Sequence, residues 1–579
     1  MEAQVVAIEV KPILGIGTVT YATGLAFGAD TAAPWILSTC PVPPNHAVAV
    51  ALQGRVLEAQ VVANVTVERS TEAFSSLASR GWCCGSGGSF LEPSMSCRLQ
   101  LLLLRPKLRL EGLETRQAQG HSGTLRVSFR DCCASWIGQR VALHAAPFGA
   151  RVDAPGATTW ARFARVVMQG VVSNLSCPPG LLMSDVHAAE SCAGAAVVLQ
   201  SSNEVVGSLK DPEGKLQNHC VELSGESVAL SLAIPMSMIL DTLLDNDACR
   251  EELKEELAAL PVPCAFEASP PCEVRQGVAL LWLDSGSWAS AIVLSEQGHL
   301  LTCAHLLTSV SWMEGQQVSG RSTARQCRGR CYLSQEGKIV STTFEADVLQ
   351  IFEGCLDAAL LLARPMRHGV PPLFNPSLWQ RRATAEELVQ GIEVSAVGYG
   401  LFGPGCPWQG PAVTTGQLCK IAYSCRLDGG RRAAVLQSSA AVHRGCSGGA
   451  LVAQGRLLGM VTTNVKQQDG SVMPHVNFIL PVTLLTPICT YLENLKVLPA
   501  EQALKRLTEE LRFSAANEEE QGLWRLETET LELPSRASGF DRWRSHENYH
   551  GLGKAIQFQR FFFLRTSPFS CFCFGLSVC

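Results

Sequence analysis

The chain has 579 residues, of which 47% are hydrophobic and 17% charged, and its formal net charge is −5. A chain of this length is expected to form more than one domain, and its apolar content argues against broad disorder. The slightly acidic balance, without a basic stripe, argues against a nucleic-acid partner.

Residues 1–245 contain short apolar runs bounded by glycine, proline, serine or asparagine, and residues 271–495 repeat this pattern. Such runs are typical of antiparallel strands in sandwiches or barrels. Between them, residues 246–270 predict a short helical linker, because leucines at helical spacing share one face and Pro261 ends it. No run of about 18 apolar residues occurs, so no membrane span is predicted.

The C-terminal part divides into two further segments. Residues 496–540 predict a helical extension, with the helix itself over about 501–513. Residues 541–579 hold phenylalanine and cysteine clusters with neither a helical nor a strand period, so an aperiodic, possibly variant tail is expected.

The chain contains 24 cysteines. Its first residues lack the basic region of a secretory signal, so we expect free thiols in a reducing compartment. The pairs Cys83-Cys84 and Cys132-Cys133 lack the second CxxC of a zinc site. We therefore predict neither a metal nor a cofactor.

The strongest local signal for chemistry is Gly445-Cys446-Ser447-Gly448-Gly449. Glycines around a serine let the backbone turn sharply and direct its N–H groups at a substrate oxygen. The N–H groups of Gly445 and Ser447 are the predicted oxyanion donors. A glycine-rich turn with a serine is nevertheless common without any function, so this motif is not decisive alone.

Two further polar residues sit at the ends of apolar runs. His305 follows Leu300-Leu-Thr-Cys-Ala, and Asp357 opens the run Ala358-Ala-Leu-Leu-Leu362. Each, taken singly, is more often a packed polar residue. The order His305, Asp357, Ser447 is, however, the chain order of the chymotrypsin arrangement. The α/β-hydrolases are disfavoured because they place the acid and then the base after the serine.

Around these residues the sequence resembles the trypsin-like clan. Thr302-Cys-Ala-His305, Asp357-Ala-Ala-Leu360 and the glycine-rich motif are similar to its histidine, aspartate and serine motifs, and Asn477-Phe-Ile-Leu-Pro481 resembles a Deg/HtrA segment. The resemblance implies a catalytic triad of His305, Asp357 and Ser447 and a substrate-binding strand at Thr462, Thr463 and Asn464. Cys446 departs from the pattern, and as a nucleophile it would be out of register with the glycines.

The first half aligns with the second but lacks its chemistry. The alignment puts Val42 in the base slot, Arg98 in the acid slot and Cys192 in the nucleophile slot. Chance similarity among apolar strands is the alternative. A true repeat predicts an all-β fold of two tandem chymotrypsin-like double β-barrel domains, the first degenerate and the second active, with a short helical linker and a C-terminal helix.

A degenerate half before an active Deg-like half resembles the peroxisomal leader peptide-processing protease family over about residues 1–495. The resemblance implies a serine endopeptidase that removes N-terminal targeting leaders from peroxisomal matrix enzymes of fatty-acid β-oxidation. It also implies protein substrates, a homo-oligomer with self-processing, and a peroxisomal location. The last residues, Ser577-Val578-Cys579, lack the family's Ser-Lys-Leu-type signal. A general Deg-type quality-control peptidase and a catalytically silent scaffold stay open as alternatives.

Overall fold

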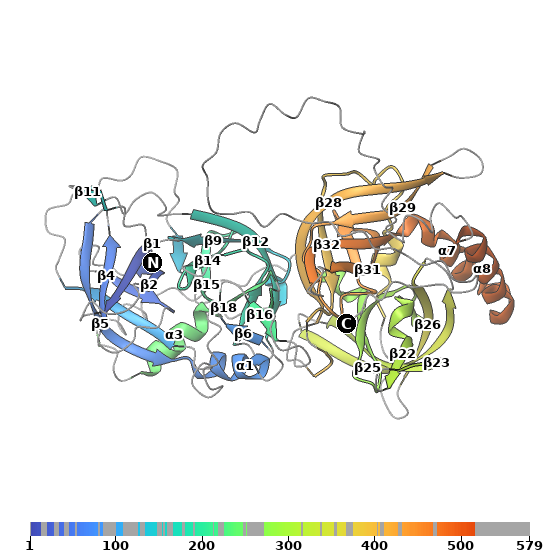
Figure 1. Cartoon of the computed structure of the whole chain (residues 1–579), viewed down its shortest axis with the longest axis horizontal. Coiled ribbons are helices and arrows are strands. Elements are labelled where there is room, and N and C mark those ends of the chain that lie inside the picture. The colour runs from blue at the N-terminus through green and yellow to red at the C-terminus, as the bar shows by residue number, and fades with distance from the viewer. Residues whose placement is uncertain are drawn as a thin grey trace.

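The computed structural model of the chain is shown in Figure 1. Almost all of the predicted linker at 246–270 and all of residues 516–579 lie outside the residues that the structure describes. The described residues are 2–12, 20–27, 34–39, 46–52, 55–78, 82–84, 100–107, 125–127, 134–146, 153–154, 157–158, 166–176, 180–188, 192–211, 214–217, 225–227, 229–246, 251, 271–313, 316–335, 338–352, 356–365, 374–401, 403–405, 410–425, 431–466 and 472–515.

The second half of the chain forms two closed barrels of six antiparallel strands each. Barrel 3 contains, in ring order, β19 (Val278–Trp282), β20 (Trp288–Val293), β21 (His299–Thr302), β26 (Ala358–Pro365), β25 (Lys338–Phe352) and β24 (Gln326–Gln335). Barrel 4 contains β27 (Glu393–Gly398), β28 (Ala412–Cys425), β29 (Arg431–Ser438), β32 (Val472–Pro481), β31 (Arg456–Lys466) and β30 (Ala450–Ala453).

The first half forms two similar rings joined by the short strand β8 (Leu125–Val127). Barrel 1 contains, in ring order, β1 (Glu2–Pro12), β2 (Thr20–Phe27), β3 (Trp35–Ser38), β7 (Gln100–Pro106), β5 (Arg55–Thr66) and β4 (His46–Leu52). Barrel 2 contains β9 (Arg140–Ala145), β12 (Val166–Leu175), β13 (Leu182–Ser184), β18 (Ser231–Pro235), β15 (Glu204–Asp211) and β14 (Ala196–Leu199).

Both halves therefore have the same strand order. In each half the first barrel closes by pairing its first strand with its fourth, β1 with β4 and β19 with β24. The second barrels close equivalently, through β14 with β15 and β30 with β31. The predicted all-β fold of two tandem double-barrel domains is confirmed. The boundaries of the five segments, at 1–245, 246–270, 271–495, 496–540 and 541–579, stay predictions.

Strand β26 shows why apolar runs without alternation can form barrel walls. Ala359 and Leu361 point into the core of barrel 3, together with Leu300 and Phe344. The intervening Leu360 points to the other side, into a core shared between barrels. Because both faces of the strand are buried, the run is apolar throughout, and its polar first neighbour, Asp357, lies where two barrels meet.

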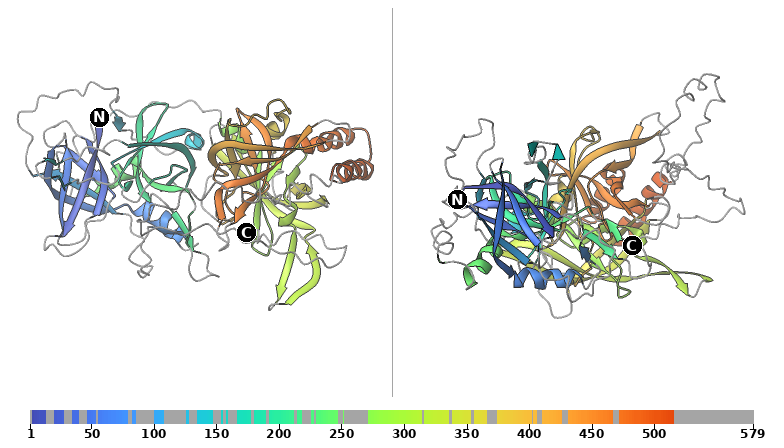
Figure 2. Two further views of the ribbon diagram at one scale, coloured as in Figure 1. Left: turned by 45° about the horizontal axis from the view of Figure 1, so that its top comes forward. Right: turned by 60° about the vertical axis from the view of Figure 1, so that its left-hand side comes forward.

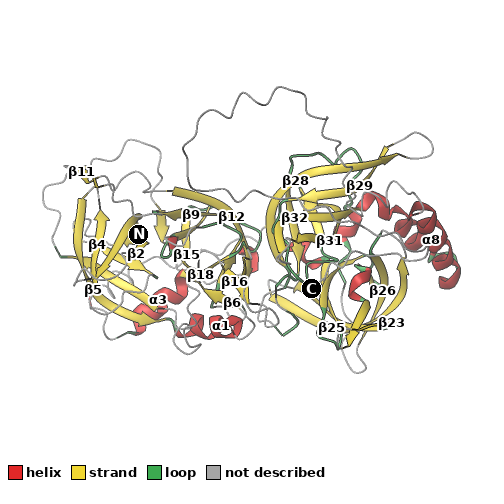
Figure 3. Cartoon of the chain, viewed as in Figure 1, coloured by secondary structure: helices red, strands yellow, loops and turns green. Residues whose placement is uncertain are grey.

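The helices lie at the periphery of the strands (Figure 3). They are α1 (Glu68–Ala78), α3 (Met236–Asp245), α5 (Pro271–Gln276), α6 (Ser377–Gln380), α7 (Thr486–Asn494) and α8 (Ala500–Ala515), with 3-10 turns η1 (Ala134–Trp136), η3 (Ala304–Leu306) and η4 (Val482–Leu485). Helix α8 confirms the predicted C-terminal helix, and it buries Ala503, Leu507 and Leu511 at a spacing of one helical turn. No helix within the described ranges is long and apolar enough to span a membrane.

Four small pairings complete the strands. They are β10 (Asp153–Ala154) with β11 (Ala157–Thr158), β16 (Gly214–Gln217) with β17 (Gly225–Ser227) and with β6 (Trp82–Cys84), and β22 (Thr308–Met313) with β23 (Gln316–Thr323). The hairpin of β22 and β23 begins just after the turn η3 and forms a two-stranded sheet of its own.

The two halves meet through barrels 2 and 4, which lie side by side in Figures 1 and 2. Strand β12 contacts β28, its equivalent in the other half. Arg140 and Glu393 form an ion pair there. The two residues occupy equivalent positions, because Arg140 begins β9 opposite Val171 of β12, and Glu393 begins β27 opposite Gln417 of β28. Contact between equivalent surfaces is the arrangement of a two-fold symmetric dimer, here made within one chain.

Candidate active site

The first two predicted triad residues are brought together by neighbouring strands. β21 pairs with β26 so that Thr302 lies opposite Ala359. His305 stands on the turn η3 just after β21, and Asp357 directly precedes β26. Because antiparallel partners bring the end of one strand to the start of the other, the two side chains meet at the mouth of barrel 3.

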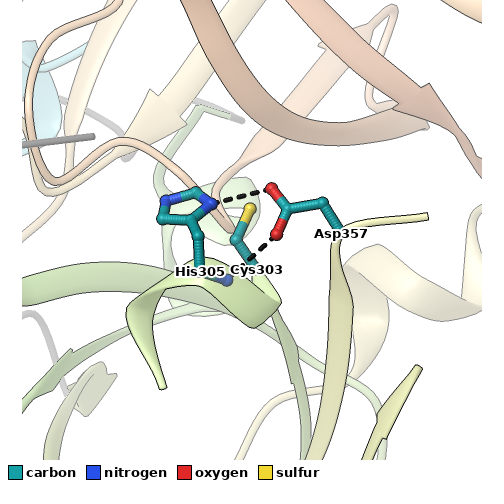
Figure 4. Close-up of side chains that lie close together, drawn as sticks. All are labelled: Cys303, His305 and Asp357. Carbon is teal, nitrogen blue, oxygen red and sulfur yellow. Dashed lines mark hydrogen bonds and ion pairs between the residues drawn. The ribbon is translucent and has the colours of Figure 1, made fainter. Parts of the chain in front are cut away.

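The carboxylate of Asp357 holds His305 at two points (Figure 4). His305 Nδ1 lies 2.7 Å from Asp357 Oδ2, and the backbone N–H of His305 donates to Oδ1 at 3.0 Å. The ionised carboxylate can only accept, so this contact assigns the proton to Nδ1 and leaves Nε2 as an acceptor. Asp357 has a φ of +40°, a conformation that aspartate tolerates better than most residues.

Cys303 lies beside this pair (Figure 4). Its thiol is fully buried, and burial, followed by the Asp357 charge, raises its pKa well above the ordinary value. Atoms of Cys303, His305 and Asp357 that could bind a metal lie within 4.8 Å of one another. The His305–Asp357 contact of 2.7 Å is nevertheless too short for an ion between the two atoms, since ligands of one zinc ion sit about 2 Å from the metal at tetrahedral angles.

The predicted nucleophile, Ser447, lies on the glycine-rich turn between β29 and β30 and is 8% exposed. Gly445 and Gly448 have φ values of +92° and +81°, which favour glycine. A Cβ on Gly445 would collide with Trp288 Nε1 and with the carbonyl of Tyr399. The glycines of the motif are thus required by both backbone conformation and space.

Ser290, on β20, donates two hydrogen bonds to the backbone of this turn. Its N–H donates to the Ser447 carbonyl at 2.8 Å, and its hydroxyl donates to the Gly445 carbonyl at 2.7 Å. Sequence reasoning missed this residue. The available signal was a hydroxyl within the buried apolar run Trp288-Ala-Ser-Ala-Ile-Val293, because buried hydroxyls usually have a partner.

The carbonyl of Val461 ties the serine turn to the histidine strand. It accepts from the N–H of Gly448 at 2.7 Å and from the thiol of Cys303 at 3.3 Å. Among the described residues, no hydrogen bond joins Ser447 Oγ to His305. Such hydrogen bonds are often long without substrate and tighten when it binds.

The three residues predicted to bind substrate lie on β31, whose residues 461–464 pair with β32. Thr462 is buried, and its hydroxyl donates to the Phe478 carbonyl at 2.8 Å, so only its backbone is available to a substrate. Thr463 is half-buried. The backbone of Asn464 lies opposite Asn477, and its side chain lies outside the described residues.

The first half repeats the serine turn with a different residue in the nucleophile slot. The N–H of Thr23 donates to the Ala193 carbonyl at 2.9 Å, as Ser290 does to Ser447 at 2.8 Å. Ala193, and not the predicted Cys192, is therefore the structural equivalent of Ser447. The predicted assignment of Cys192 was wrong by one residue.

The neighbouring glycine supports this register. Gly194 has a φ of +88° and Gly448 one of +81°. The N–H of each donates at 2.7 Å to the second strand that follows it, to the carbonyl of Leu209 on β15 or of Val461 on β31. Cys192 is thereby equivalent to Cys446. The other two predicted slots, Val42 and Arg98, lie outside the described residues.

Cys446 itself is buried, and burial raises the pKa of its thiol to about 11. At pH 8 only about one molecule in a thousand would carry the thiolate, which is the reactive form. We expect iodoacetamide at pH 8 to alkylate the exposed Cys419 without loss of peptidase activity, and Cys446→Ser to remain active. Loss of activity in Cys446→Ser, together with rapid inactivation of the wild-type chain as peptide mapping finds Cys446 alkylated, would show that the thiol is the nucleophile.

Residues 289–460 match the family model described as a trypsin-like peptidase domain. This span contains the histidine, the aspartate and the glycine-rich serine turn. The chain thus carries a peptidase domain of the trypsin-like serine class.

Two curated relatives are more specific. The chain is 31% identical over 286 residues to the peroxisomal leader peptide-processing protease of Homo sapiens, covering 47% of this chain and 43% of the relative. Against the Mus musculus protein it is 30% identical over 272 residues, covering 46% and 42%. The predicted resemblance is confirmed: the chain is related to the peroxisomal leader peptide-processing proteases, and the match spans less than half of their length.

Solved structures similar to this chain include the crystal structure of Deg5, at 17% identity and a TM-score of 0.26, covering 37% of this chain and 87% of that one. The HtrA-type protease AlgW matches at 22% identity and a TM-score of 0.27, covering 38% and 62%.

Proposed function

We propose that the chain is an active serine endopeptidase with Ser447 as nucleophile. The observation that carries the proposal is the two-point contact of Asp357 with His305, beside a serine turn that needs its glycines. In this mechanism His305 Nε2 takes the proton of the Ser447 hydroxyl as the oxygen attacks the scissile carbonyl. His305 then gives that proton to the leaving amine, and Asp357 stabilises the imidazolium in between.

The N–H groups of Gly445 and Ser447 are proposed to bind the oxyanion of the tetrahedral intermediate. Neither is a donor in the described backbone hydrogen bonds of the turn, whereas their carbonyls are both held by Ser290. The peptide planes that carry the two donors are held through the carbonyls before them, because Arg444 O accepts from the N–H of Leu401 and Cys446 O from that of Gly449, each at 2.8 Å.

The substrate is proposed to bind as an extended peptide along residues 462–464 of β31. The described strands pair with this segment only on the β32 side, whereas the N–H and the carbonyl of Val461 are both bonded to the serine turn. An unpaired strand edge can bind an extended peptide by main-chain hydrogen bonds. This mode suits a cleavage site within an unfolded leader or an exposed linker.

We propose leader removal from peroxisomal matrix enzymes of fatty-acid β-oxidation as the biological reaction. The support is the relationship to proteases named for peroxisomal leader processing. A peroxisomal location, homo-oligomers and self-processing are proposed on the same ground. A protein-level test is N-terminal mapping of peroxisomal lysates treated with the wild-type chain or with Ser447→Ala.

The expected result of this mapping is a small set of new N-termini near the starts of matrix enzymes, present only with the wild-type chain. Casein serves as the comparison substrate. Rapid digestion of casein, with new N-termini spread along many unfolded proteins, would instead indicate a general quality-control peptidase. The absence of any new N-terminus would favour a silent scaffold.

A further inference from the structure

Asp185 links the two halves through a buried carboxylate. It follows β13 in the first half and is 7% exposed. Its Oδ1 accepts from the N–H of Val171, in its own half, at 2.6 Å. Its Oδ2 accepts from Thr415 of the second half, from the N–H at 2.6 Å and from the hydroxyl at 2.8 Å. These partners matter because burial raises the pKa of Asp185 and its hydrogen bonds oppose that shift.

The equivalent residue in the second half is Ser439. Its hydroxyl accepts from the N–H of Gln417 at 2.9 Å, just as Asp185 accepts from Val171. The serine side chain serves only its own half in this contact. The longer aspartate makes the same local contact and also crosses to the other half, so the link between halves is a feature that the degenerate half adds to the shared fold.

A second contact from the same segment reaches β32. The rings of His187 and His475 lie with their centroids 4.7 Å apart. His475 Nδ1 in turn lies 2.8 Å from the carbonyl of Ser439. Asp185 and His187 thus touch the second half at β28 and at β32.

These two strands hold the segment Ser438–Ala441. Thr414, next to Thr415, donates its hydroxyl to the Ala441 carbonyl at 2.6 Å. Asn477 donates to the carbonyls of Ser438, at 3.2 Å, and Ala440. In trypsin-type sites the residue about six positions before the nucleophile lines the specificity pocket, which here is Ala441.

The back of this segment is closed by the first half. A cavity between the halves is lined by Met183 and Leu230 on one side and by Thr414, Ala441 and Cys446 on the other. Among the described residues, by contrast, the hydrogen bonds of the serine turn named above all go to Ser290 and Val461 of the second half.

We infer that the degenerate half sets the specificity pocket of the active half: Asp185 and His187 are positioning residues that hold Ser438–Ala441 through Thr415 and His475. The inference rests on the proposed endopeptidase function. It adds that substrate binding is controlled separately from the chemical step. Substrate binding depends on the contact between halves, whereas the reactivity of Ser447 does not.

The test uses the full chain and the substitution Asp185→Asn, with Asp245→Asn as the matched control because Asp245 is exposed on the first half. An amide in place of the carboxylate can accept at only one of its two ends. We expect kcat/KM for peptide substrates to fall at least about tenfold, mainly through KM, because small displacements of a binding wall are costly. Inactivation by a small fluorophosphonate should keep the wild-type rate.

His187→Ala and His187→Phe give a second pair that does not disturb a buried charge. Alanine should raise KM, and phenylalanine, which keeps a ring against His475, should restore it. Parallel loss of peptide cleavage and fluorophosphonate labelling in Asp185→Asn would overturn the inference, and so would unchanged KM in both Asp185→Asn and His187→Ala. A wild-type chain that neither labels nor cleaves would refute the proposed function instead, whatever the variants do.

Discussion

Ser447→Ala is expected to lower kcat by about a million-fold, and His305→Ala by a similar factor, as happens when either member of such a triad is removed. The reason is that the attack step needs both the hydroxyl and the acceptor nitrogen at once. Without Ser447 no acyl-enzyme forms, and without His305 the hydroxyl keeps its proton at neutral pH. Initial rates on a quenched-fluorescence peptide measure both losses.

The double variant Ser447→Ala/His305→Ala separates a triad from two independent contributions. Residues that act as a unit show strongly non-additive losses, so the double variant should be about as slow as either single one. Thermal unfolding of all three variants, close to that of the wild-type chain, would show that the fold is intact. Multiplicative losses would contradict the assignment of these two residues to one reaction step.

Asp357→Asn is expected to lower kcat by about ten-thousand-fold, which is the second large effect. The two carboxylate oxygens accept from Nδ1 and from the backbone N–H of His305 at 2.7 and 3.0 Å. An asparagine has a single carbonyl oxygen, so keeping the backbone contact turns its NH2 group toward Nδ1. The imidazole would then carry its proton on Nε2, where it cannot accept one from Ser447.

Asp284→Asn is the matched control, because Asp284 lies in the same half with 86% of its side chain exposed. Exposed ion pairs contribute little to stability, so this control should retain full activity. A comparable loss in both variants, or wild-type activity in Asp357→Asn, would show that the contact with His305 does not serve catalysis.

The parts of this site that could be predicted from the sequence are those that belong to short, continuous sequence patterns. His305 and Asp357 each end or begin an apolar strand, and the glycines around Ser447 answer a backbone requirement that is visible in the sequence. The repeated pattern of short apolar runs predicted antiparallel strands for the same reason, and the resemblance to the trypsin-like clan implied the double-barrel architecture.

Contacts between distant segments could not be predicted this way. Ser290 and Asp185 act through hydrogen bonds to residues far along the chain, and no local pattern encodes such a partner. Cys192 was wrongly aligned with Ser447 because the residues on both sides of it are small, so the sequence alignment can shift by one position without a mismatch. The positive φ of Gly194 and the hydrogen bond from Thr23 to Ala193 fix the alignment only in three dimensions.

The most direct test of the central claim is the mass of the chain after treatment with a fluorophosphonate, followed by peptide mapping. We predict one adduct on Ser447 in the wild-type chain, and none in Ser447→Ala, in His305→Ala or in chain unfolded before treatment. An adduct that persists in Ser447→Ala, or a wild-type chain that gains no mass at all, would contradict it.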